Sequence, residues 1–272
     1  MKSLVFICDY GEDSLATGEV LAAIQKNARA PFPVFVLAAR PLNTIHTGFL
    51  LDQMQRNLER EMADSIVFFL NTDPRTHTKE PILQGNGAPL FAAKLANGAL
   101  VLSPNAGHCL SFVKDKISSL RIISLPEAKT QFRSRDLFSS FVAKALLGEL
   151  EESAGSPVSL EEIPGLPKEP FIVHIDNYGN IKISYSLAEK ERDRIQWGDK
   201  VKVRMGEREA EAQAAPSIFA VPPGTLAFAP GSSGDPQNPY FELSLRFQGT
   251  LRQSAAKVFG WPEPGDNIEI QK

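Results

Sequence analysis

The sequence predicts a two-domain protein: a mostly parallel α/β sandwich over residues 1–160, followed by a small all-β barrel over residues 161–272. Three observations lead to this prediction. The chain has 272 residues, more than the about 100–200 residues of a usual single domain. Its first half alternates apolar, strand-like runs with amphipathic helical stretches, a pattern typical of parallel sheets covered by helices. Its second half has short strands between Gly, Pro and Asp turns, which is typical of barrels and sandwiches.

The N-terminal domain is predicted from apolar runs that end in polar turns. Leu4–Cys8, Pro33–Ala39 and Ser65–Leu70 are short and apolar, and we expect each to form a buried strand. Helices are predicted between them, over about residues 14–25 and over His46–Met62, where apolar residues recur at helical spacing. Two further strands and a helix are predicted at Leu100–Leu102, Arg121–Leu125 and Asp136–Leu150.

Residues 151–170 differ in character from the chain before them, because four prolines occur there among Ser, Gly and Glu residues. This composition is typical of a linker, so we place the domain boundary within it. Beyond it, short strands are predicted at Phe171–Ile175, Ile181–Tyr185, Lys200–Met205, Ser217–Ala220, Thr225–Ala229, Phe241–Phe247 and Asn267–Ile270.

The composition argues against several classes of function. Hydrophobic residues make up 43% and charged residues 22%, and the net charge is −3 with scattered basic residues, so no nucleic-acid partner is expected. No apolar stretch approaches the about 18 residues of a membrane helix, so no membrane partner is expected either. Asp9, Glu12 and Asp13 interrupt the segment where a signal peptide would be apolar, which favours a cytoplasmic protein. Cys8 and Cys109 are predicted to be free, structural thiols.

The motifs of common enzyme classes do not occur in the sequence. There is no phosphate-binding loop, dinucleotide-binding turn, serine nucleophile elbow or paired cysteines at zinc spacing. The four histidines stand at spacings that match no metal motif. We therefore predict neither a metal nor a resident cofactor. The histidines are His46, His77, His108 and His174.

Short polar turns follow the apolar runs, and they carry the groups that a polar ligand needs. Carboxylates accept hydrogen bonds from hydroxyls and amines, amides read a base edge, and Gly lets the backbone approach closely. Taken singly, each turn also has a structural interpretation, such as Asp9 capping the next helix or residues 176–180 closing a hairpin. The turns are Asp9-Tyr10-Gly11, Asp73-Pro74, Pro104-Asn105-Ala106-Gly107, Phe132-Arg133-Ser134-Arg135-Asp136, Asp176-Asn177-Tyr178-Gly179-Asn180 and Gly231-Ser232-Ser233-Gly234.

In their order and spacing, these turns resemble a known family over nearly the whole chain. The family is that of the S-adenosyl-L-methionine hydroxide adenosyltransferases, hydrolases related to fluorinase and chlorinase. Its motifs Thr-Asp-Phe-Gly, Asp-Pro-Gly-Val-Gly, Pro-Asp-Asn-Gly, Phe-His-Gly-Arg-Asp-Ile-Phe and Asp-x-Phe-Gly-Asn are echoed in this order by the first five turns. Gly231–Gly234, Phe241–Leu245 and Ser254–Ala256 are similar to its C-terminal segments.

The resemblance implies an α/β domain, a C-terminal β-barrel, and a homotrimer with ligand sites between neighbouring subunits. It also implies an adenosyl ligand, either S-adenosylmethionine or adenosine. In the family, the residue matching Asp9 holds the ribose hydroxyls, and those matching Asp176 and Asn180 reach the methionine amine and the adenine. Ser232 and Ser233 match the segment that holds the methionine carboxylate.

The resemblance further implies hydrolysis of S-adenosylmethionine to adenosine and methionine, with Asp73 at the position that orients the attacking water. The two other catalytic positions differ, because Glu80 stands where the family has Arg and Arg133 stands where it has His. An arginine cannot accept a proton at physiological pH. Activation of water would then need Asp73 with other help, for example from His77 or His108, and Arg133 could instead bind an anion. The alternative is a non-catalytic trimeric adenosine-binding or S-adenosylmethionine-binding protein.

Overall fold

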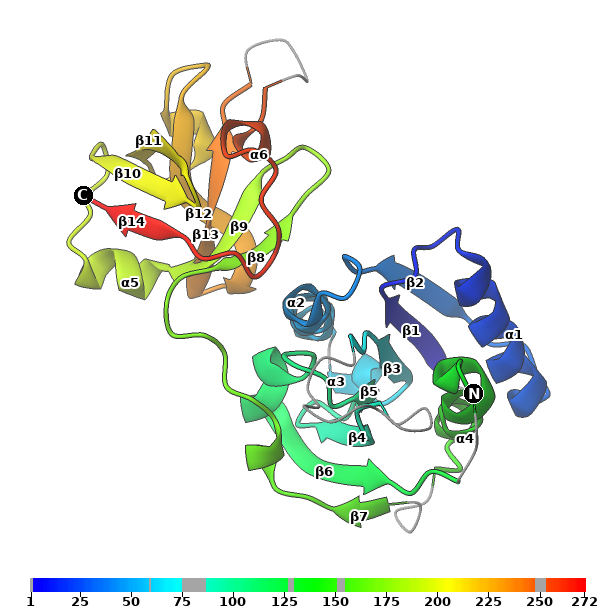
Figure 1. The fold of residues 1–272 in the computed structure, drawn as a ribbon. Helices are drawn as coiled ribbons and strands as arrows, with labels where there is room; N and C mark the ends of the chain where they lie inside the picture. The colour runs from blue at the N-terminus through cyan, green and yellow to red at the C-terminus, as the bar shows by residue number, and fades with distance from the viewer. Residues whose placement is uncertain (1, 59, 75–86, 127–129, 151–154, 248–252) are drawn as a thin grey trace. The chain divides into compact units, whose positions relative to one another are not determined.

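The structure is a computed structural model that describes residues 2–58, 60–74, 87–126, 130–150, 155–247 and 253–272. The chain divides into two compact units, residues 1–166 and residues 167–272. Each unit is built around its own seven-stranded sheet (Figure 1). The protein is therefore of mixed α/β class.

The first unit has a sheet of order β2-β1-β3-β5-β4-β6-β7. Strands β2, β1, β3 and β5 are parallel to one another, whereas β4, β6 and β7 pair antiparallel with their neighbours. The prediction of a mostly parallel sheet is therefore right for one half of the sheet and wrong for the other. Only four residues connect β4 to β5, too few for the crossover that a parallel pair requires. The strands are β1 Ser3–Cys8, β2 Val34–Ala38, β3 Ile66–Asn71, β4 Leu90–Leu95, β5 Leu100–Pro104, β6 Ile117–Ile123 and β7 Gly155–Pro157.

Helices cover both faces of this sheet, and each face has its own apolar core. Helices α1 (Leu15–Ala28) and α4 (Ser139–Leu147) pack together over the face that contains Phe6 and Phe69. Helix α2 (Thr44–Arg56) and the 3₁₀ turn η1 (Ser111–Lys116) cover the face that contains Ile7 and Phe68. Adjacent strand residues point to opposite faces, which explains why neighbours such as Phe6 and Ile7 belong to different cores.

Local signals set the helix ends. The Ser14 side chain accepts a hydrogen bond from the N–H of Ala16 and begins α1, and Arg29 ends it in the left-handed conformation with φ +54°. Asp9 therefore does not cap this helix. The helix predicted over 46–62 is divided into α2 and the short α3 (Arg60–Ala63), because the chain tightens at Asn57.

Strand β2 corrects the expectation of a buried strand at 33–39. It is the edge strand of the sheet, and Val34 and Phe35 are 44% and 53% exposed. An apolar run alone does not tell a central strand from an edge strand, because both pair through the same backbone groups.

The second unit has a curled sheet of order β14-β10-β11-β12-β13-β9-β8, and its two ends meet at an isolated bridge between Phe171 and Asn267. Its core includes Ile183, Tyr185 and Phe241. Two short helices, α5 (Leu187–Arg192) and α6 (Ala255–Val258), belong to this unit, so it is not all β. The strands are β8 Ile172–Ile175, β9 Ile181–Ser186, β10 Lys200–Met205, β11 Arg208–Ala214, β12 Leu226–Asp235, β13 Asn238–Leu245 and β14 Glu269–Gln271.

One predicted strand of this unit is wrong, and one observed strand was missed. Residues 217–220 do not form a strand but contain a 3₁₀ turn, η5 (Ile218–Ala220), in which Phe219 is 79% exposed. Strand β11 was not predicted, because its outward positions are charged or amide residues and its inward positions are alanines. In the first unit, strand β7 and the turn η4 (Leu160–Glu162) lie in the segment expected to be a linker.

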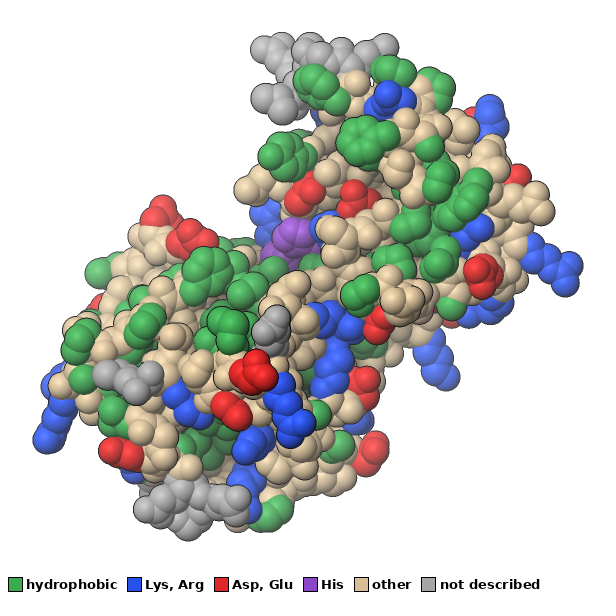
Figure 2. Space-filling view, turned by 180° about the vertical axis from the view of Figure 1, so that it is seen from behind, with side chains coloured by type: hydrophobic (Ala, Val, Ile, Leu, Met, Phe, Trp, Pro, Cys, Tyr) green, Lys and Arg blue, Asp and Glu red, His purple; other side chains and the backbone are tan. Residues whose placement is uncertain are grey.

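Within the described part of the chain, none of the helices has both the length and the apolar character needed to cross a bilayer. On the face shown in Figure 2, basic and acidic side chains are interspersed.

Candidate functional site

A cavity of about 260 Å³ lies at the carboxyl ends of β1 and β3, the neighbouring parallel strands of the first unit. From β1 the chain passes to β2 on one side, and from β3 it continues to β4, beyond β5, on the other. The cavity therefore lies at the point where the strand order reverses, which is where open α/β sheets generally bind ligands. It is lined by Asp9, Tyr10, Leu42, Asn71, Asp73, Gln131, Phe132, Arg133, Ser134 and Phe138.

Asp9 follows the last residue of β1 and is held by the turn after β2. Its Oδ2 accepts a hydrogen bond of 3.0 Å from the N–H of Leu42. Leu42 is in the left-handed conformation, with φ +59°, and this turns its N–H toward the carboxylate. Partial burial raises the pKa of Asp9 above its ordinary value, and the nearby Asp73 carboxylate raises it further. Asp9 is thus an oriented hydrogen-bond acceptor at the cavity wall.

Asp73 and Arg133 form an ion pair in the same cavity. Arg133 Nη1 lies 3.5 Å from Asp73 Oδ2, and this oxygen also accepts a hydrogen bond of 3.1 Å from the N–H of Ala88. Arg133 Nη2 donates to the carbonyl of Ala88, so one backbone residue contacts both members of the pair. A Cβ at Gly87 would lie 2.2 Å from Arg133 Nη1 and 2.3 Å from Asp73 Oδ2. The backbone approaches the ion pair so closely that a side chain at this position would displace Arg133 or Asp73.

Aromatic side chains form another wall of the cavity. The ring of Tyr10 meets that of Phe132 edge-on at 5.8 Å, and its hydroxyl is 2.9 Å from Ser134 Oγ. The guanidinium of Arg133 lies over the ring of Phe138, 4.8 Å from its centroid. Burial raises the pKa of the Tyr10 hydroxyl. This wall offers flat apolar surface beside the charged groups.

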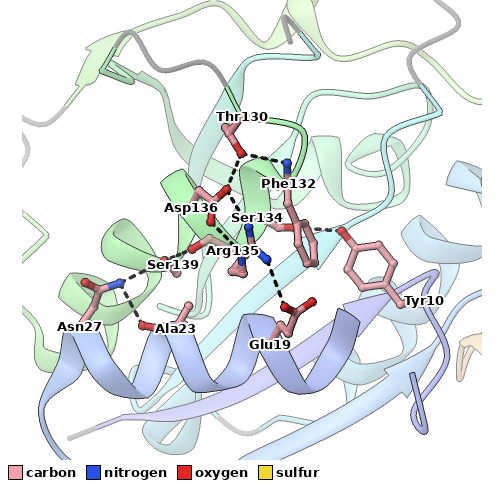
Figure 3. Close-up of polar contacts among 10 residues, drawn as sticks. All are labelled: Tyr10, Glu19, Ala23, Asn27, Thr130, Phe132, Ser134, Arg135, Asp136 and Ser139. Atoms are coloured by element: carbon pink, nitrogen blue, oxygen red, sulfur yellow. Dashed lines mark hydrogen bonds and ion pairs between the residues drawn. The ribbon is translucent and has the colours of Figure 1, made fainter. Parts of the chain in front are cut away.

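A π-helical turn, η2 (Ser134–Phe138), holds this wall against α1. Arg135 contacts Asp136 at 2.6 Å and Glu19 on α1 at 3.1 Å, and Asn27 on α1 donates to Ser139 (Figure 3). Single π-helical turns occur frequently at functional sites, because they change which side chains face inward. Here Ser134 and Phe138 face the cavity.

In the second unit, Asp176 and Asn180 lie together in the turn between β8 and β9. Asp176 Oδ1 accepts from the N–H groups of Tyr178 and Asn180, and Oδ2 accepts from Asn180 Nδ2 at 2.9 Å. These contacts support the structural interpretation of the turn, since the carboxylate orders its own loop.

Ser232 and Ser233 lie on β12 at an irregular part of its pairing with β13. Ser232 is exposed and Ser233 is buried. On the neighbouring strands, Lys182 and Glu242 form an ion pair of 2.7 Å, and Ser244 donates to Glu242. A Cβ at Gly231 would lie 2.8 Å from Glu242 Oε2. No site role was predicted from the sequence for Glu242 or Lys182.

The structure thus brings Asp9, Asp73 and Arg133 into one cavity, whereas Asp176, Asn180, Ser232 and Ser233 lie in the second unit. Glu80 and His77 lie outside the described residues. His108 contacts Ser111 at 3.2 Å and does not line the cavity.

Four lining residues belong to none of the predicted polar turns: Leu42, Asn71, Gln131 and Phe138. Asn71 stands two residues before Asp73, so strand alternation could have placed both on one side. Leu42 contributes a backbone group, and no side-chain pattern indicates it.

Cys8 and Cys109 are free and buried. Burial raises the pKa of both thiols. Among the residues that the structure describes, no three His, Cys, Asp or Glu side chains are grouped as a metal ion would require.

Comparisons with known proteins show the fold and leave the activity open. No protein-family model matches the sequence, and no curated protein matches it. The chain is similar to the crystal structure of an uncharacterized conserved protein from Thermotoga maritima, with TM-score 0.76, 20% identity, and coverage of 98% of this chain and 99% of the other. It is also similar to that of a conserved hypothetical protein from Thermus thermophilus, with TM-score 0.68, 19% identity, and coverage of 99% and 100%. Both chains share the two-unit fold over their whole length.

Proposed function

We propose that this protein binds S-adenosylmethionine or adenosine, with the ribose in the cavity between β1 and β3. The observation that carries the proposal is the meeting of Asp9, Asp73 and Arg133 in that cavity, at the ligand-binding edge of the sheet. The resemblance of the turns to the hydroxide adenosyltransferases supports the adenosyl class of ligand.

The geometry around Asp9 suits a vicinal diol. A carboxylate can accept hydrogen bonds from two hydroxyls, and the N–H of Leu42 fixes its orientation before a ligand arrives. Tyr10 and Phe132 provide flat apolar surface on the same cavity. A sugar with one polar edge and one apolar face fits this combination.

The cavity is smaller than the about 300–1,000 Å³ of typical ligand pockets, so we propose that it holds only part of the ligand. The groups assigned by the resemblance to the adenine and the methionine, Asp176, Asn180, Ser232 and Ser233, lie in the second unit. We propose that the second unit of a neighbouring copy completes the site in a cytoplasmic homotrimer. In such an arrangement each subunit contributes to two sites.

The proposed reaction is slow hydrolysis of S-adenosylmethionine. Water attacks C5′ of the ribose, the C5′–S bond breaks, and its electron pair neutralises the sulfonium as methionine leaves. Asp73 takes the proton of the attacking water, which leaves adenosine with a new 5′-hydroxyl. Asp73 is already paired with Arg133, and taking up a proton would weaken that pair, so we expect little catalysis from this carboxylate.

The same ion pair favours a second candidate function, binding without turnover. Arg133 is nine-tenths buried and donates to the carbonyl of Ala88, so it holds Asp73 as part of the structure. A site of this kind could recognise the ligand and leave its bonds intact.

Three measurements on the purified protein test these proposals. Calorimetric titration should detect binding of S-adenosylmethionine or adenosine, and binding of neither would overturn the proposed ligand class. Chromatography of adenosine at saturating S-adenosylmethionine separates slow hydrolysis from binding alone. Light scattering should give three times the monomer mass of 29.8 kDa, and the monomer mass would refute the shared site.

A further inference from the structure

A second cavity, of about 230 Å³, lies at the opposite end of the parallel strands of the first unit. Lys2 precedes β1, Asp64 precedes β3, and Leu100 begins β5. The six residues of β1 separate this end of the sheet from the carboxyl end that carries Asp9, a length of about 20 Å. The two cavities have no lining residue in common.

The floor of this cavity is formed by residues of β5, β4 and β6. Leu150, which follows the end of α4, also lines it. Cross-strand pairing places Leu100, Lys94 and Ser119 in one row across β5, β4 and β6. Ala92 and Arg121 are paired in the next row. Paired residues point to the same face, which here is the face covered by α1 and α4. The lining residues are Lys2, Asp64, Ala92, Lys94, Gly98, Leu100, Ser119, Arg121, Ile123, Leu150 and Gly155.

Basic side chains predominate among the charged residues of this lining, where Lys2, Lys94 and Arg121 stand against Asp64. Two contacts hold parts of this lining in place. Arg121 Nη1 donates to the carbonyl of Gly155 at 3.0 Å, and the N–H of Lys2 donates to the carbonyl of Leu146 near the end of α4. Asp64 lies against the β4–β5 turn, because a Cβ at Gly98 would be 2.1 Å from its Oδ1. Cations and apolar side chains therefore share this part of the sheet, with Lys94 beside Leu100 and Arg121 beside Ala92.

We propose that this cavity is a binding site for a small organic phosphate, with the phosphate between Lys2, Lys94 and Arg121 and the apolar part of the ligand on Ala92 and Leu100. Several cations around one cavity favour a phosphate dianion over a single carboxylate. An apolar floor adds affinity for a ligand that carries an apolar body. The inference does not depend on the proposed adenosyl site, since the two cavities lie at opposite ends of the sheet.

Titration with three probes tests the chemical class of the ligand. Phenyl phosphate carries a dianion and a ring, inorganic phosphate carries only the charge, and benzoate carries a ring with a single charge. We expect phenyl phosphate to bind more tightly than either of the others. Absence of phenyl phosphate binding, or equal binding of benzoate and phenyl phosphate, would overturn the assignment.

Variants show where phenyl phosphate binds, and they separate the effect of the charges from that of the apolar floor. We expect R121Q and K94Q to weaken phenyl phosphate binding about tenfold, the effect of losing one charge-assisted hydrogen bond. D64N should tighten it, because the substitution removes the opposing charge. A92L should abolish binding of phenyl phosphate and retain that of inorganic phosphate, since it fills the floor and leaves the cations in place.

Two controls complete the design. K26Q removes the same charge from the exposed last turn of α1, outside the cavity, and should leave binding unchanged. A loss of phenyl phosphate binding in K26Q equal to that in K94Q would show a general charge effect and refute the site. R121Q also loses the contact with Gly155, so the unfolding midpoint of this variant is measured alongside its binding. Lys94 is exposed, so K94Q tests the site without a change in folding stability.

Discussion

Arg133 Nη1 lies 3.5 Å from Asp73 Oδ2, and the backbone of Ala88 contacts both side chains. The pair joins the end of β3 to the segment that begins η2. It also sets a basic group, which cannot accept a proton, against the carboxylate to which the proposed hydrolysis assigns the activation of water. In the proposed function, this relationship would separate the binding of a ligand from its turnover.

The first prediction concerns ligand binding. Asp9→Ala should weaken the binding of adenosine or S-adenosylmethionine by about 1.5–3 kcal/mol, because it removes charge-assisted hydrogen bonds to the ribose. Calorimetric titration of parent and variant measures the difference. Asp13→Ala, an exposed carboxylate in the next loop, is the matched control and should bind like the parent. Equal affinities for the parent and Asp9→Ala would rule out this role for Asp9.

The second prediction concerns turnover. Arg133→His combined with Glu80→Arg restores the residues of the hydroxide adenosyltransferases at both altered positions. A positioned base contributes about 10²–10⁴-fold, so we expect adenosine release at saturating S-adenosylmethionine to rise within that range. A parent that is already as fast as the double variant would mean that Asp73 works with other groups, and His108 and His77 would be replaced next.

The third prediction concerns pH. The pKa of Asp9 is raised above 3.8 in the folded protein, chiefly by burial, so the folded state holds its proton to higher pH than the unfolded state does. Stability must then fall as the pH rises from 3.8 through the raised pKa, and it stays reduced above it. Asp9→Asn lacks this penalty and should be more stable than the parent at neutral pH, with no advantage below both pKa values. Urea unfolding between about pH 3 and 8 measures the difference, and an advantage that does not change with pH would contradict the prediction.

The fourth prediction concerns the core of the first unit. Asp52 is 1% exposed, and its carboxylate contacts Lys116, Arg56 and Gln55. Breaking a buried ion pair costs about 3–5 kcal/mol of stability. We expect Asp52→Ala to lower the free energy of unfolding by somewhat less, about 2–3 kcal/mol, because Arg56 and Lys116 are partly exposed. Urea unfolding measures the loss. Glu211→Ala breaks the exposed ion pair with Lys200 and should change stability by less than about 1 kcal/mol.

The fifth prediction concerns the thiols. Cys8 and Cys109 are buried and their pKa values are raised, so little thiolate is present at neutral pH. A thiol reagent should react slowly with the native protein and rapidly with both cysteines in urea. Rapid reaction of either thiol in the native protein would contradict the burial described.

Several parts of the site could be predicted from the sequence because they depend on local patterns. The runs ending at Cys8 and Leu70 are apolar enough to identify two strands, and parallel neighbours place the residues after them at one edge. That reasoning is sufficient to bring Asp9 and Asp73 together. The same reasoning does not predict Leu42. Its N–H reaches Asp9 because the backbone is left-handed in the turn after β2.

Other parts depend on contacts between distant segments. The approach of Gly87 to Arg133 depends on how β4 enters the sheet, and β4 was not predicted. β11 escaped prediction because its pattern of charged residues and alanines is also compatible with a helix. The exposure of Phe35 depends on the order of strands, which the apolar character of β2 does not specify.

The exposed edge at β2 has a practical consequence for handling the protein. An edge strand that presents Val34 and Phe35 to water is a template onto which another strand can pair. Substituting Phe35 by lysine would place a charge on that edge. It should raise the protein concentration at which aggregation begins. A dilution series followed by static light scattering would show whether self-association at this edge limits solubility.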